Sequence, residues 1–474
     1  MTWTRAIAFA GALLGAMAAS GCTDSNAPVS PPLTVTAVSP TSGPMAGGTS
    51  VTITGTNFTD VTSVTISHGE LGNRTVVSPT EITGTTPAGS TAGPTDIVVT
   101  SSHGSDTCTS CFSYFTSGAL IAFTAGGRHT CELTSSGAAY CWGRNYFGEL
   151  GNGSNTPSSV RVAVTGGLTF SALTAGGSHT CGLTPNGASY CWGANGFGQL
   201  GNDVRDSSTV PVSVSGGIVF SALSAGGSAI FARHGHTCGL TASGNAYCWG
   251  YNEFGQLGNG TFTSSSVPVA VQGGLSFIKL ASGEFRTCGL TTSGAAYCWG
   301  SGEAGQLGNE SNANTSVPVA VSGGLTFATL SAGGTHNCGL TSSGVAYCWG
   351  WNDFGQLGDG SNITRYAPVP VTGGLAFSAL ALGGGYSCGL TTGGAAYCWG
   401  HNAYGQLGNG SNTYTSAPVP VTGGLTFSAL DAGAWHNCAP TTGGAVYCWG
   451  YNEYGQLGNE SNTNSSVPVP VIQQ

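Results

Sequence analysis

The chain of 474 residues has very few charged side chains. Asp, Glu, Lys and Arg together make up 6% of it, against roughly 25% in an ordinary globular protein. Ser, Thr, Asn and Gln must therefore carry most of the surface. The ten Lys and Arg residues are scattered and the formal net charge is −9. Because no basic run is present that could neutralise phosphates, we expect no nucleic-acid partner.

A membrane-spanning stretch is also missing from the N-terminal region. Arg5 is followed by a short apolar segment, residues 6–19, which falls below the roughly 20 residues of a transmembrane helix. We interpret residues 1–21 as a cleaved export signal. The small residues before Cys22 resemble the processing site of bacterial lipoproteins, and this resemblance implies that Cys22 carries a lipid. Ordinary cleavage nearby, without a lipid, is the alternative.

Recognisable catalytic arrangements are lacking as well. Asp96, Asp106 and the few Glu residues show no pairing at a spacing typical of hydrolases. Neither a nucleophile elbow nor a zinc-binding helix motif occurs. The sequence therefore predicts a protein that is not an enzyme, with no catalytic residues, no cofactor and no metal site.

Cysteine and glycine, by contrast, are abundant, with 17 and 81 residues. Fourteen cysteines stand ten residues apart in a stretch that occurs seven times, most plainly as residues 336–350. Its two alternating runs flank a short loop ending in Gly344, which suits a type I turn with a left-handed third residue. Strands paired about Ser343 would place Cys338 directly opposite Cys348, within bridging distance. We predict seven hairpin disulfides: Cys131–Cys141, Cys181–Cys191, Cys238–Cys248, Cys288–Cys298, Cys338–Cys348, Cys388–Cys398 and Cys438–Cys448.

One further cysteine pair, Cys108 and Cys111, has the spacing of a redox motif. It lies among predicted strands and not at the start of a helix, which would activate a thiolate. A zinc site would need a second free pair. We therefore expect a structural bridge, which leaves Cys22 as the single unpaired cysteine. So many paired cysteines indicate an oxidising compartment, either the bacterial cell envelope or the extracellular space.

The region before the repeats divides into two parts. Residues 22–32 are rich in proline and form a linker. Short alternating runs over residues 33–116, with turn residues between them, predict a small β-sandwich. The sequence of residues 38–44 and 47–58 resembles that of the immunoglobulin-like domain shared by plexins and certain transcription factors. This resemblance implies a spacer or adhesive unit, and no DNA-reading loop can be carried over.

Residues 117–474 repeat with a period of about 50, broken once by an insertion at residues 229–235. Four short strands per period predict a β-propeller. We expect each blade to run from a Pro-Val strand, such as residues 367–371, to the Trp strand. The long link at residues 400–416 would then cross to the next blade. On this interpretation residues 467–472 pair with an incomplete first blade and close the ring, with their prolines at an edge.

A further resemblance rests on three recurring sequence motifs: Gly-Gly-x-His-x-Cys-Gly-Leu, Tyr-Cys-Trp-Gly and Gly-Gln-Leu-Gly-Asn. They resemble the regulator-of-chromosome-condensation repeat, whose family implies a seven-bladed propeller. The expected fold is all-β, a seven-bladed β-propeller preceded by an immunoglobulin-like β-sandwich. The eukaryotic namesake is a guanine-nucleotide exchange factor, and exported propellers similar to this chain include inhibitors of β-lactamases that act through a rim of aromatic residues.

Some repeated positions are expected to serve the scaffold. The Trp of each Tyr-Cys-Trp-Gly is predicted to lie in the core between blades, and Gly-Gln-Leu-Gly to be an architectural turn. The position two before the first hairpin cysteine is occupied by His129, His179, His236, Arg286, His336, Tyr386 and His436. One such residue per blade indicates a repeated hydrogen bond to the backbone and not a metal site. The insertion at residues 229–235 either projects from the third blade or is a loop extension without a function.

Positions at which the repeats differ are free to serve a partner. The hypothetical footprint lies just after the Trp strands, on one rim, where exposed aromatics would alternate with acids. It consists of Tyr251, Trp351, His401 and Tyr451, with Glu253, Asp353 and Glu453 close by. Neutral drift of loop residues is the alternative. The favoured function is a non-catalytic binding module for a protein or glycan, attached to the membrane only through its lipid. An enzyme inhibitor, an exchange factor and a purely structural role are the alternatives.

Overall fold

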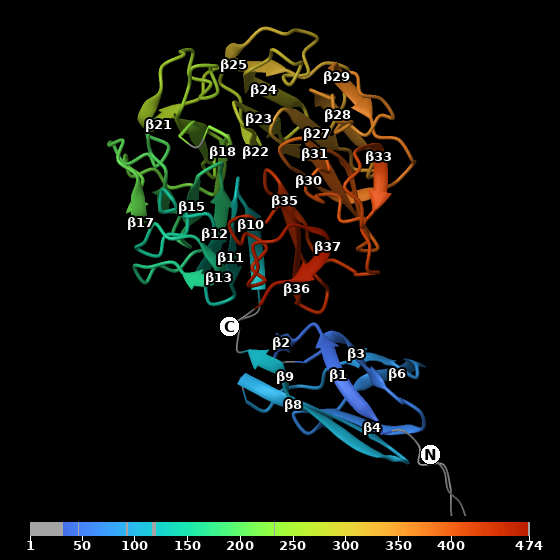
Figure 1. Ribbon diagram of the computed structural model, residues 1–474. Helices are drawn as coiled ribbons and strands as arrows, with labels where there is room; N and C mark the ends of the chain where they lie inside the picture. The colour runs from blue at the N-terminus through green and yellow to red at the C-terminus, as the bar shows by residue number, and fades with distance from the viewer. Residues whose placement is uncertain (1–31, 46, 92, 116–119, 232, 473–474) are drawn as a thin grey trace, which may run out of the picture.

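The computed structural model describes residues 32–45, 47–91, 93–115, 120–231 and 233–472 (Figure 1). The proposed signal, Cys22 and nearly all of the linker lie outside these ranges. Within them the chain is all-β, as predicted, and none of its segments forms a helix of the length and apolar character that crossing a membrane requires. Figure 1 looks onto the ring of the propeller, with the N-terminal domain below it.

The N-terminal domain is a sandwich of two sheets, ordered β1-β3-β7-β6 and β2-β9-β8-β4-β5. The first sheet contains β1 (Thr34–Ser39), β3 (Ser50–Thr56), β6 (Gly72–Ser78) and β7 (Glu81–Thr85). The second contains β2 (Ser42–Pro44), β4 (Val61–Ile66), β5 (Gly69–Glu70), β8 (Gly93–Ser101) and β9 (Gly104–Phe115). Ile53, Ile82 and Phe112 are fully buried between them. Cys108 and Cys111 lie at disulfide distance within β9.

The propeller consists of seven sheets of four strands each. Blades one and two contain β10 (Leu120–Ala125), β11 (His129–Thr134), β12 (Ala139–Gly143) and β13 (Ser158–Ala163), then β14 (Ala172–Ala175), β15 (His179–Leu183), β16 (Ser189–Gly193) and β17 (Ser208–Ser213). Blades three and four contain β18 (Ala222–Gly227), β19 (Gly235–Leu240), β20 (Ala246–Gly250) and β21 (Ser265–Ala270), then β22 (Phe277–Ser282), β23 (Arg286–Thr291), β24 (Ala296–Gly300) and β25 (Thr315–Ala320).

The remaining blades follow the same order along the chain. Blade five contains β26 (Thr329–Ala332), β27 (His336–Leu340), β28 (Ala346–Gly350) and β29 (Arg365–Pro370). Blade six contains β30 (Phe377–Leu382), β31 (Tyr386–Thr391), β32 (Ala396–Gly400) and β33 (Thr415–Pro420). Blade seven contains β34 (Asp431–Ala432), β35 (His436–Pro440), β36 (Val446–Gly450) and β37 (Ser465–Pro470).

This strand order shows that the predicted blade boundaries are wrong. Each Trp strand pairs with the Pro-Val strand that follows it, so that Cys348 of β28 lies opposite Val369 of β29. The long connector therefore stays within its blade, and the tight link at residues 371–375 crosses to the next one. The length of the connector was misleading because hydrogen bonds fold it back on itself, as described below.

The predicted closure by the C-terminal strand is also wrong. β37 pairs with β36 of its own blade, and the first blade is complete without it. The ring closes instead by side-chain packing and hydrogen bonds between blades one and seven. Trp142 of blade one is buried among Val446, Leu457 and Val471 of blade seven, and its indole N–H donates to the Gln456 carbonyl over 2.9 Å. The prolines do lie in the outer edge strands, where a missing N–H donor is tolerated.

The hairpins agree with the sequence prediction. Cys338 and Cys348 are direct partners across the ladder, and the same register holds in all seven hairpins. Gly344 ends the turn with φ +84°. The seven pairs of sulfur atoms lie at disulfide distance. Each such short cross-link can stabilise the fold by about 3 kcal/mol through loop entropy.

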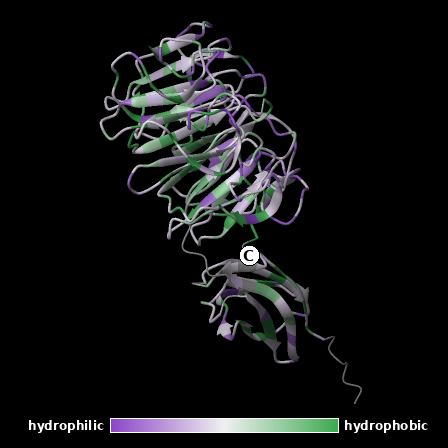
Figure 2. Cartoon of the chain, turned by 90° about the vertical axis from the view of Figure 1, so that its left-hand side faces the viewer, coloured by the Kyte–Doolittle hydropathy of each residue, from purple (hydrophilic) through white to green (hydrophobic). Residues whose placement is uncertain are grey.

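The core of the propeller lies between adjacent blades. Trp349 of blade five is fully buried against Leu290, Cys298 and Leu307 of blade four, and the other blades repeat this arrangement. Figure 2 shows hydrophobic residues gathered on the strands and many hydrophilic ones in the loops. The predicted role of the Trp residues as inter-blade core is confirmed.

Candidate partner-binding face

The inner part of the ring is a closed series of hydrogen bonds between blades. His336 Nε2 lies 2.7 Å from the hydroxyl of Ser387 in the next blade, and that hydroxyl donates to the Gln356 carbonyl. His129, His179 and His236 contact threonine hydroxyls in the same way. His436 of blade seven reaches Thr130 of blade one over 2.8 Å, which completes the circle.

The hydrogen-bond partners of the histidines differ from the predicted backbone partners. Each His meets a side-chain hydroxyl and not the backbone, because the Ser or Thr of the next blade points into the interface. Tyr386 does donate to backbone carbonyls, those of Gly433 and His436. Arg286 donates to the carbonyls of Gly333, Gly334 and His336 and to the Asn337 side chain.

Burial keeps these histidines neutral. It lowers the pKa of His129, His236, His336 and His436 to about 3 and that of His179 to about 4. In a neutral imidazole that donates to a hydroxyl through Nε2–H, the other nitrogen, Nδ1, carries no proton. Nδ1 has no hydrogen-bond partner in His179, His236, His336 and His436. Over the described ranges, no group of three or more His, Cys, Asp or Glu residues could hold a metal ion.

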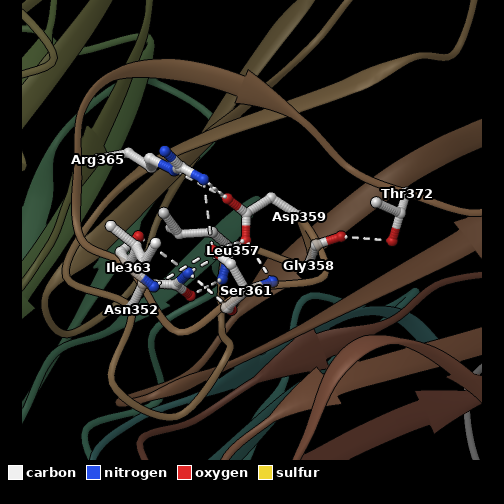
Figure 3. A network of polar contacts seen from close by, with 8 residues as sticks. All are labelled: Asn352, Leu357, Gly358, Asp359, Ser361, Ile363, Arg365 and Thr372. Carbon is white, nitrogen blue, oxygen red and sulfur yellow. Dashed lines mark hydrogen bonds and ion pairs between the residues drawn. The ribbon is translucent and has the colours of Figure 1, made fainter.

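The connector after each Trp strand is held by a buried asparagine. In blade five the Asn352 side chain accepts from the Leu357 N–H over 2.9 Å and donates to the Ser361 and Ile363 carbonyls (Figure 3). Arg365 pairs with Asp359 over 2.8 Å at the base of β29. These bonds fold the connector into a compact loop, which brings β29 back beside β28.

The compact connector presents a large side chain to one face of the ring. Phe354, whose N–H donates to Gln356 Oε1, has its ring 4.8 Å from His401 and 5.2 Å from Tyr414 of the next blade. Six of the seven connectors have an aromatic residue here: Phe147, Phe197, Phe254, Phe354, Tyr404 and Tyr454, with Ala304 in blade four. The start of each connector, such as residues 351–354, lies near the turn between the first two strands of a blade, such as residues 383–385. We call these turns the Gly-Gly turns, and we call the surface that they form with the connector starts the aromatic face.

Ring contacts join the aromatic face into two clusters. The first contains Phe197, Phe231, His234, Tyr251, Phe254 and Phe285. The second contains Tyr146, Trp351, Phe354, His401, Tyr404, Tyr414, Trp435, Tyr451 and Tyr454. The most exposed of these side chains are Phe231 at 57%, Tyr146 at 54%, Tyr414 at 44% and Tyr404 at 37%.

The predicted footprint falls on this face, but its exposure was judged wrongly. Tyr251 and His401 are only 4% and 7% exposed, because the aromatic residue of the preceding connector covers each of them. Trp351 and Tyr451 are half-buried, and Glu253, Asp353 and Glu453 are exposed. The missed residues are those directly before Gly-Gln-Leu-Gly, whose recurring aromatic character in the sequence was the signal that could have found them.

Arginine side chains lie over one part of the aromatic face. The Arg128 guanidinium is 5.7 Å from the Tyr451 ring, and that of Arg144 is 5.5 Å from the Tyr146 ring. Arg233 lies 5.7 Å from the Phe147 ring. The guanidinium groups also bond within the chain, since Arg128 donates to the Tyr454 hydroxyl and Arg144, only 9% exposed, pairs with Glu149 over 3.7 Å. They therefore help to fix the positions of the rings beside them.

The insertion at residues 229–235 belongs to the same face. His234 packs 4.6 Å from the Tyr251 ring, and the Arg233 carbonyl accepts from the Gln199 side chain over 2.9 Å. Ile230 and Phe231 at its tip are 64% and 57% exposed. The insertion is therefore anchored on the propeller and adds apolar surface to the aromatic face. Residue 232 lies outside the described ranges.

A cavity of about 390 Å³ lies at the centre of the ring. Its walls are small residues, because an Ala-Gly-Gly segment or a close variant from each blade lines it. The larger side chains in the lining are Leu382, which ends β30, and six residues of the connectors, the Gly-Gly turns and the insertion: Ile230, Glu284, Thr335, Trp351, Phe354 and Trp435.

The N-terminal domain approaches the opposite side of the propeller. Gly48, Thr49 and Thr85 share a cavity with the hairpin turn at residues 441–443 of blade seven. Hairpin turns and connectors leave a blade at opposite ends of its strands. The sandwich domain therefore leaves the aromatic face uncovered.

Comparison with protein families agrees with this architecture. The model of the RCC1-like domain matches residues 174–473, and two models of the regulator of chromosome condensation (RCC1) repeat match residues 121–149 and 136–183. The IPT/TIG domain model matches residues 33–115. No curated protein is similar enough in sequence to match the chain.

Solved structures show the same fold. Human WBSCR16 is 21% identical with a TM-score of 0.63, and the match covers 70% of this chain and 89% of that one. Prp20p from Saccharomyces cerevisiae is 21% identical with a TM-score of 0.63, and the match covers 72% of this chain and 87% of that one. At these identities the likeness concerns the fold alone.

Proposed function

Because the chain belongs to the family of the RCC1-like domain, we propose that its propeller is a non-catalytic binding module that presents the aromatic face to a protein or glycan. One observation carries this proposal. Exposed Tyr and Phe side chains, with arginines stacked among them, gather on a single face of a ring that is otherwise repetitive.

Aromatic residues and arginine dominate the binding energy of protein interfaces. The connectors that carry them are already ordered by the buried asparagines, so little conformational entropy is lost when a partner binds. The same properties suit an enzyme inhibitor of the kind that the sequence resembles. An inhibitor is therefore the second candidate function.

The proposed location is the bacterial cell envelope. Residues 1–21 direct export, Cys22 carries the lipid, and the IPT/TIG domain spaces the propeller from the membrane. Labelling with a palmitate analogue tests this, with a Cys22→Ala variant as the control. A mature wild-type protein that takes up no label and partitions wholly into the aqueous phase would exclude the anchor.

The binding proposal is tested by cross-linked pull-down with the propeller as bait. A Phe231→Ala, Tyr404→Ala, Tyr414→Ala triple variant should lose at least about tenfold in capture, since each hot-spot residue contributes at least ~1 kcal/mol. A Val219→Ala, Ile278→Ala variant is the matched control, because both side chains are exposed and lie at the hairpin end of the blades. Val219 lies against Gly187 of one hairpin turn, and Ile278 follows Phe277, whose N–H donates to the Gly244 carbonyl of another. Equal capture by the triple variant and the parent would refute the aromatic face as the binding surface.

The two alternatives have their own measurements. Titration of purified protein against β-lactamases should show tight inhibition if the inhibitor function is correct, and the triple variant should abolish it. The structure of Prp20p is described together with the binding of that protein to Gsp1p and histones. A nucleotide-release assay with a GTPase tests the corresponding activity here, and we expect no acceleration from an exported protein.

A further inference from the structure

The aromatic face is interrupted at blade four. Ala304 stands where the other six connectors carry an aromatic residue, and Ser301 stands where blades three, five, six and seven carry Tyr251, Trp351, His401 and Tyr451. The next turn has Thr335 at the position of Phe285 and Trp435. Three small side chains in succession leave a gap in the ring of aromatics between blades four and five.

Glu284 lies at the inner end of this gap. The equivalent positions are Gly127, Gly177, Gly227, Gly334, Gly384 and Ala434, so a carboxylate here departs from the repeat. Among the described residues that line the central cavity, Glu284 is the only ionisable one. A charge in a wall of small apolar residues has no evident role in packing.

The surroundings of Glu284 are well ordered. Burial raises the pKa of Glu284, while the Ser228 hydroxyl that bonds it and the charge of Arg286 act against that rise. The Ser228 oxygen also accepts the N–H groups of Ile230 and Phe231 over 3.2 and 3.0 Å. The insertion thus helps to hold the carboxylate in place.

Arg286 does not saturate this carboxylate. Its guanidinium nitrogens donate to Asn337 and to the carbonyls of Gly333, Gly334 and His336. Within the described part of the chain, no cationic side chain forms an ion pair with Glu284. A cation arriving from the cavity would therefore find a partly desolvated carboxylate with capacity to accept.

Aromatic surface lines the same cavity as this carboxylate. Trp351 is held next to Thr335 of blade five, because the backbone N–H of Trp351 donates to the Thr335 carbonyl over 3.1 Å. Both residues line the cavity together with Glu284, and Arg286 of blade four bonds the Gly334 carbonyl beside Thr335 over 2.7 Å. The two blades thus bring an acid and an indole to the same cavity mouth.

We propose that the mouth of the central cavity binds an organic ammonium group, with Glu284 as its counter-ion and Trp351 as an aromatic wall. Cations are attracted to the faces of aromatic rings, tryptophan above all. The walls of small residues accept the apolar body that carries the group, and the cavity of about 390 Å³ falls within the size range of ligand sites. A free amine and a lysine side chain of a protein share this chemistry.

This site is testable without any protein partner, so its failure and that of the proposed function are distinguishable. The probe is benzylammonium, titrated against the full chain and followed by ligand-observed NMR. We expect saturable binding at millimolar concentration or below. Benzyl alcohol, a neutral molecule of nearly the same shape, should bind at least about tenfold more weakly, which corresponds to ~1.4 kcal/mol. Equal binding of the two probes would overturn the proposal.

Two variants and one control locate the site. Glu284→Gln and Trp351→Leu should each weaken benzylammonium binding about tenfold or more, whereas binding of benzyl alcohol to Glu284→Gln should change little. Glu303→Gln is the matched control, because Glu303 is an exposed acid on the neighbouring connector. Unchanged affinity in both site variants contradicts the proposal.

A purely structural role for Glu284 is distinguishable as well. If the carboxylate only offsets the charge of Arg286, Glu284→Gln will lower the melting temperature and leave benzylammonium affinity unchanged, which overturns the proposal. Should this variant fail to fold, Trp351→Leu still decides the question, since Trp351 is half-buried and outside the hydrogen-bonded ring. Tight binding of Nα-acetyl-lysine methylamide would indicate a protein side chain as the source, and binding of benzylammonium alone a free amine.

Discussion

The inner ring of this propeller and its aromatic face follow different rules. In the inner ring, five of the seven interfaces repeat one contact between a histidine and a hydroxyl of the next blade, as at His336 with Ser387 and at His436 with Thr130. At the other two, Arg286 and Tyr386 bond backbone carbonyls of the next blade. On the aromatic face, equivalent positions carry Tyr251, Ser301, Trp351 and His401. In a closed ring, each blade is related to the next by nearly the same rotation, so the residues at the inner interfaces have little freedom to vary. Connector residues do not set that angle and are free to differ.

The largest effect that separates the two regions should come from pH. The five buried histidines have pKa values of about 3 to 4, below the ordinary value of 6.5. The unfolded chain therefore binds more protons than the folded one between these limits, and stability is lost as the pH falls through this window. Each histidine contributes roughly 1.4 kcal/mol per pH unit there.

Urea midpoints at pH 7 and pH 5 measure this loss, and we expect a marked fall. Asp431, with its pKa raised to about 6, and Glu149 and Glu284, with raised pKa values, oppose the trend, but they are fewer. His336→Gln should flatten the profile relative to the parent. A midpoint that stays constant from pH 7 to pH 5 would mean that the histidines are not buried as described.

The next effect concerns ring closure. Trp142→Ala removes the packing between blades one and seven, and Trp349→Ala removes the equivalent packing between blades four and five. Both should cost about 3–5 kcal/mol, as is usual for a buried Trp. Denaturant unfolding measures the two side by side. A loss below ~1 kcal/mol for Trp142→Ala alone would indicate that the ring is open at this interface.

A smaller effect is expected in the connectors. Asn352→Ala leaves the Leu357 N–H and two carbonyls without their partner, which should cost about 1–3 kcal/mol. Blade four has Gly302 at this position and provides the contrast. Gly302→Asn should not stabilise the protein, because a Cβ there would lie 2.2 Å from the Ala313 carbonyl oxygen. A gain in melting temperature from Gly302→Asn would contradict the described connector.

The smallest effect should come from the aromatic face itself. Tyr404→Ala changes a side chain that is 37% exposed and makes no hydrogen bond through its hydroxyl among the described residues. Its effect on stability should stay within about 1 kcal/mol, far below that of the tryptophans. Thermal unfolding of this variant beside Trp349→Ala measures the difference. Comparable losses in the two would show that the face also serves the scaffold.

The hairpins were predictable because their pattern is local. Cys338, Gly344 and Cys348 lie within one turn and its two strands, so their register follows from symmetry about Ser343. The blade boundaries were not predictable from loop length. The connector of blade five is long enough to reach a neighbouring blade, and bonds such as those of Asn352 and the Arg365–Asp359 pair bring it back to its own.

Exposure on the aromatic face escaped prediction for a related reason. Tyr251 and His401 are covered by Phe197 and Phe354, which precede them by about one repeat and belong to other blades. A divergent residue after the Trp strand therefore looks like a free loop residue in the sequence. Likewise, the histidines find their hydroxyl partners one blade further on, as His336 does at Ser387.

The sequence by itself determined the number of blades, the register of each hairpin and the place of the tryptophans, because these depend on residues close together in a repeated unit. Tertiary structure alone decided which strand ends a blade, how the first and last blades meet, and which aromatic side chains reach solvent. Those properties arise from contacts between residues about 50 positions or more apart, such as Trp142 with Gln456. No pattern within one repeat contains them.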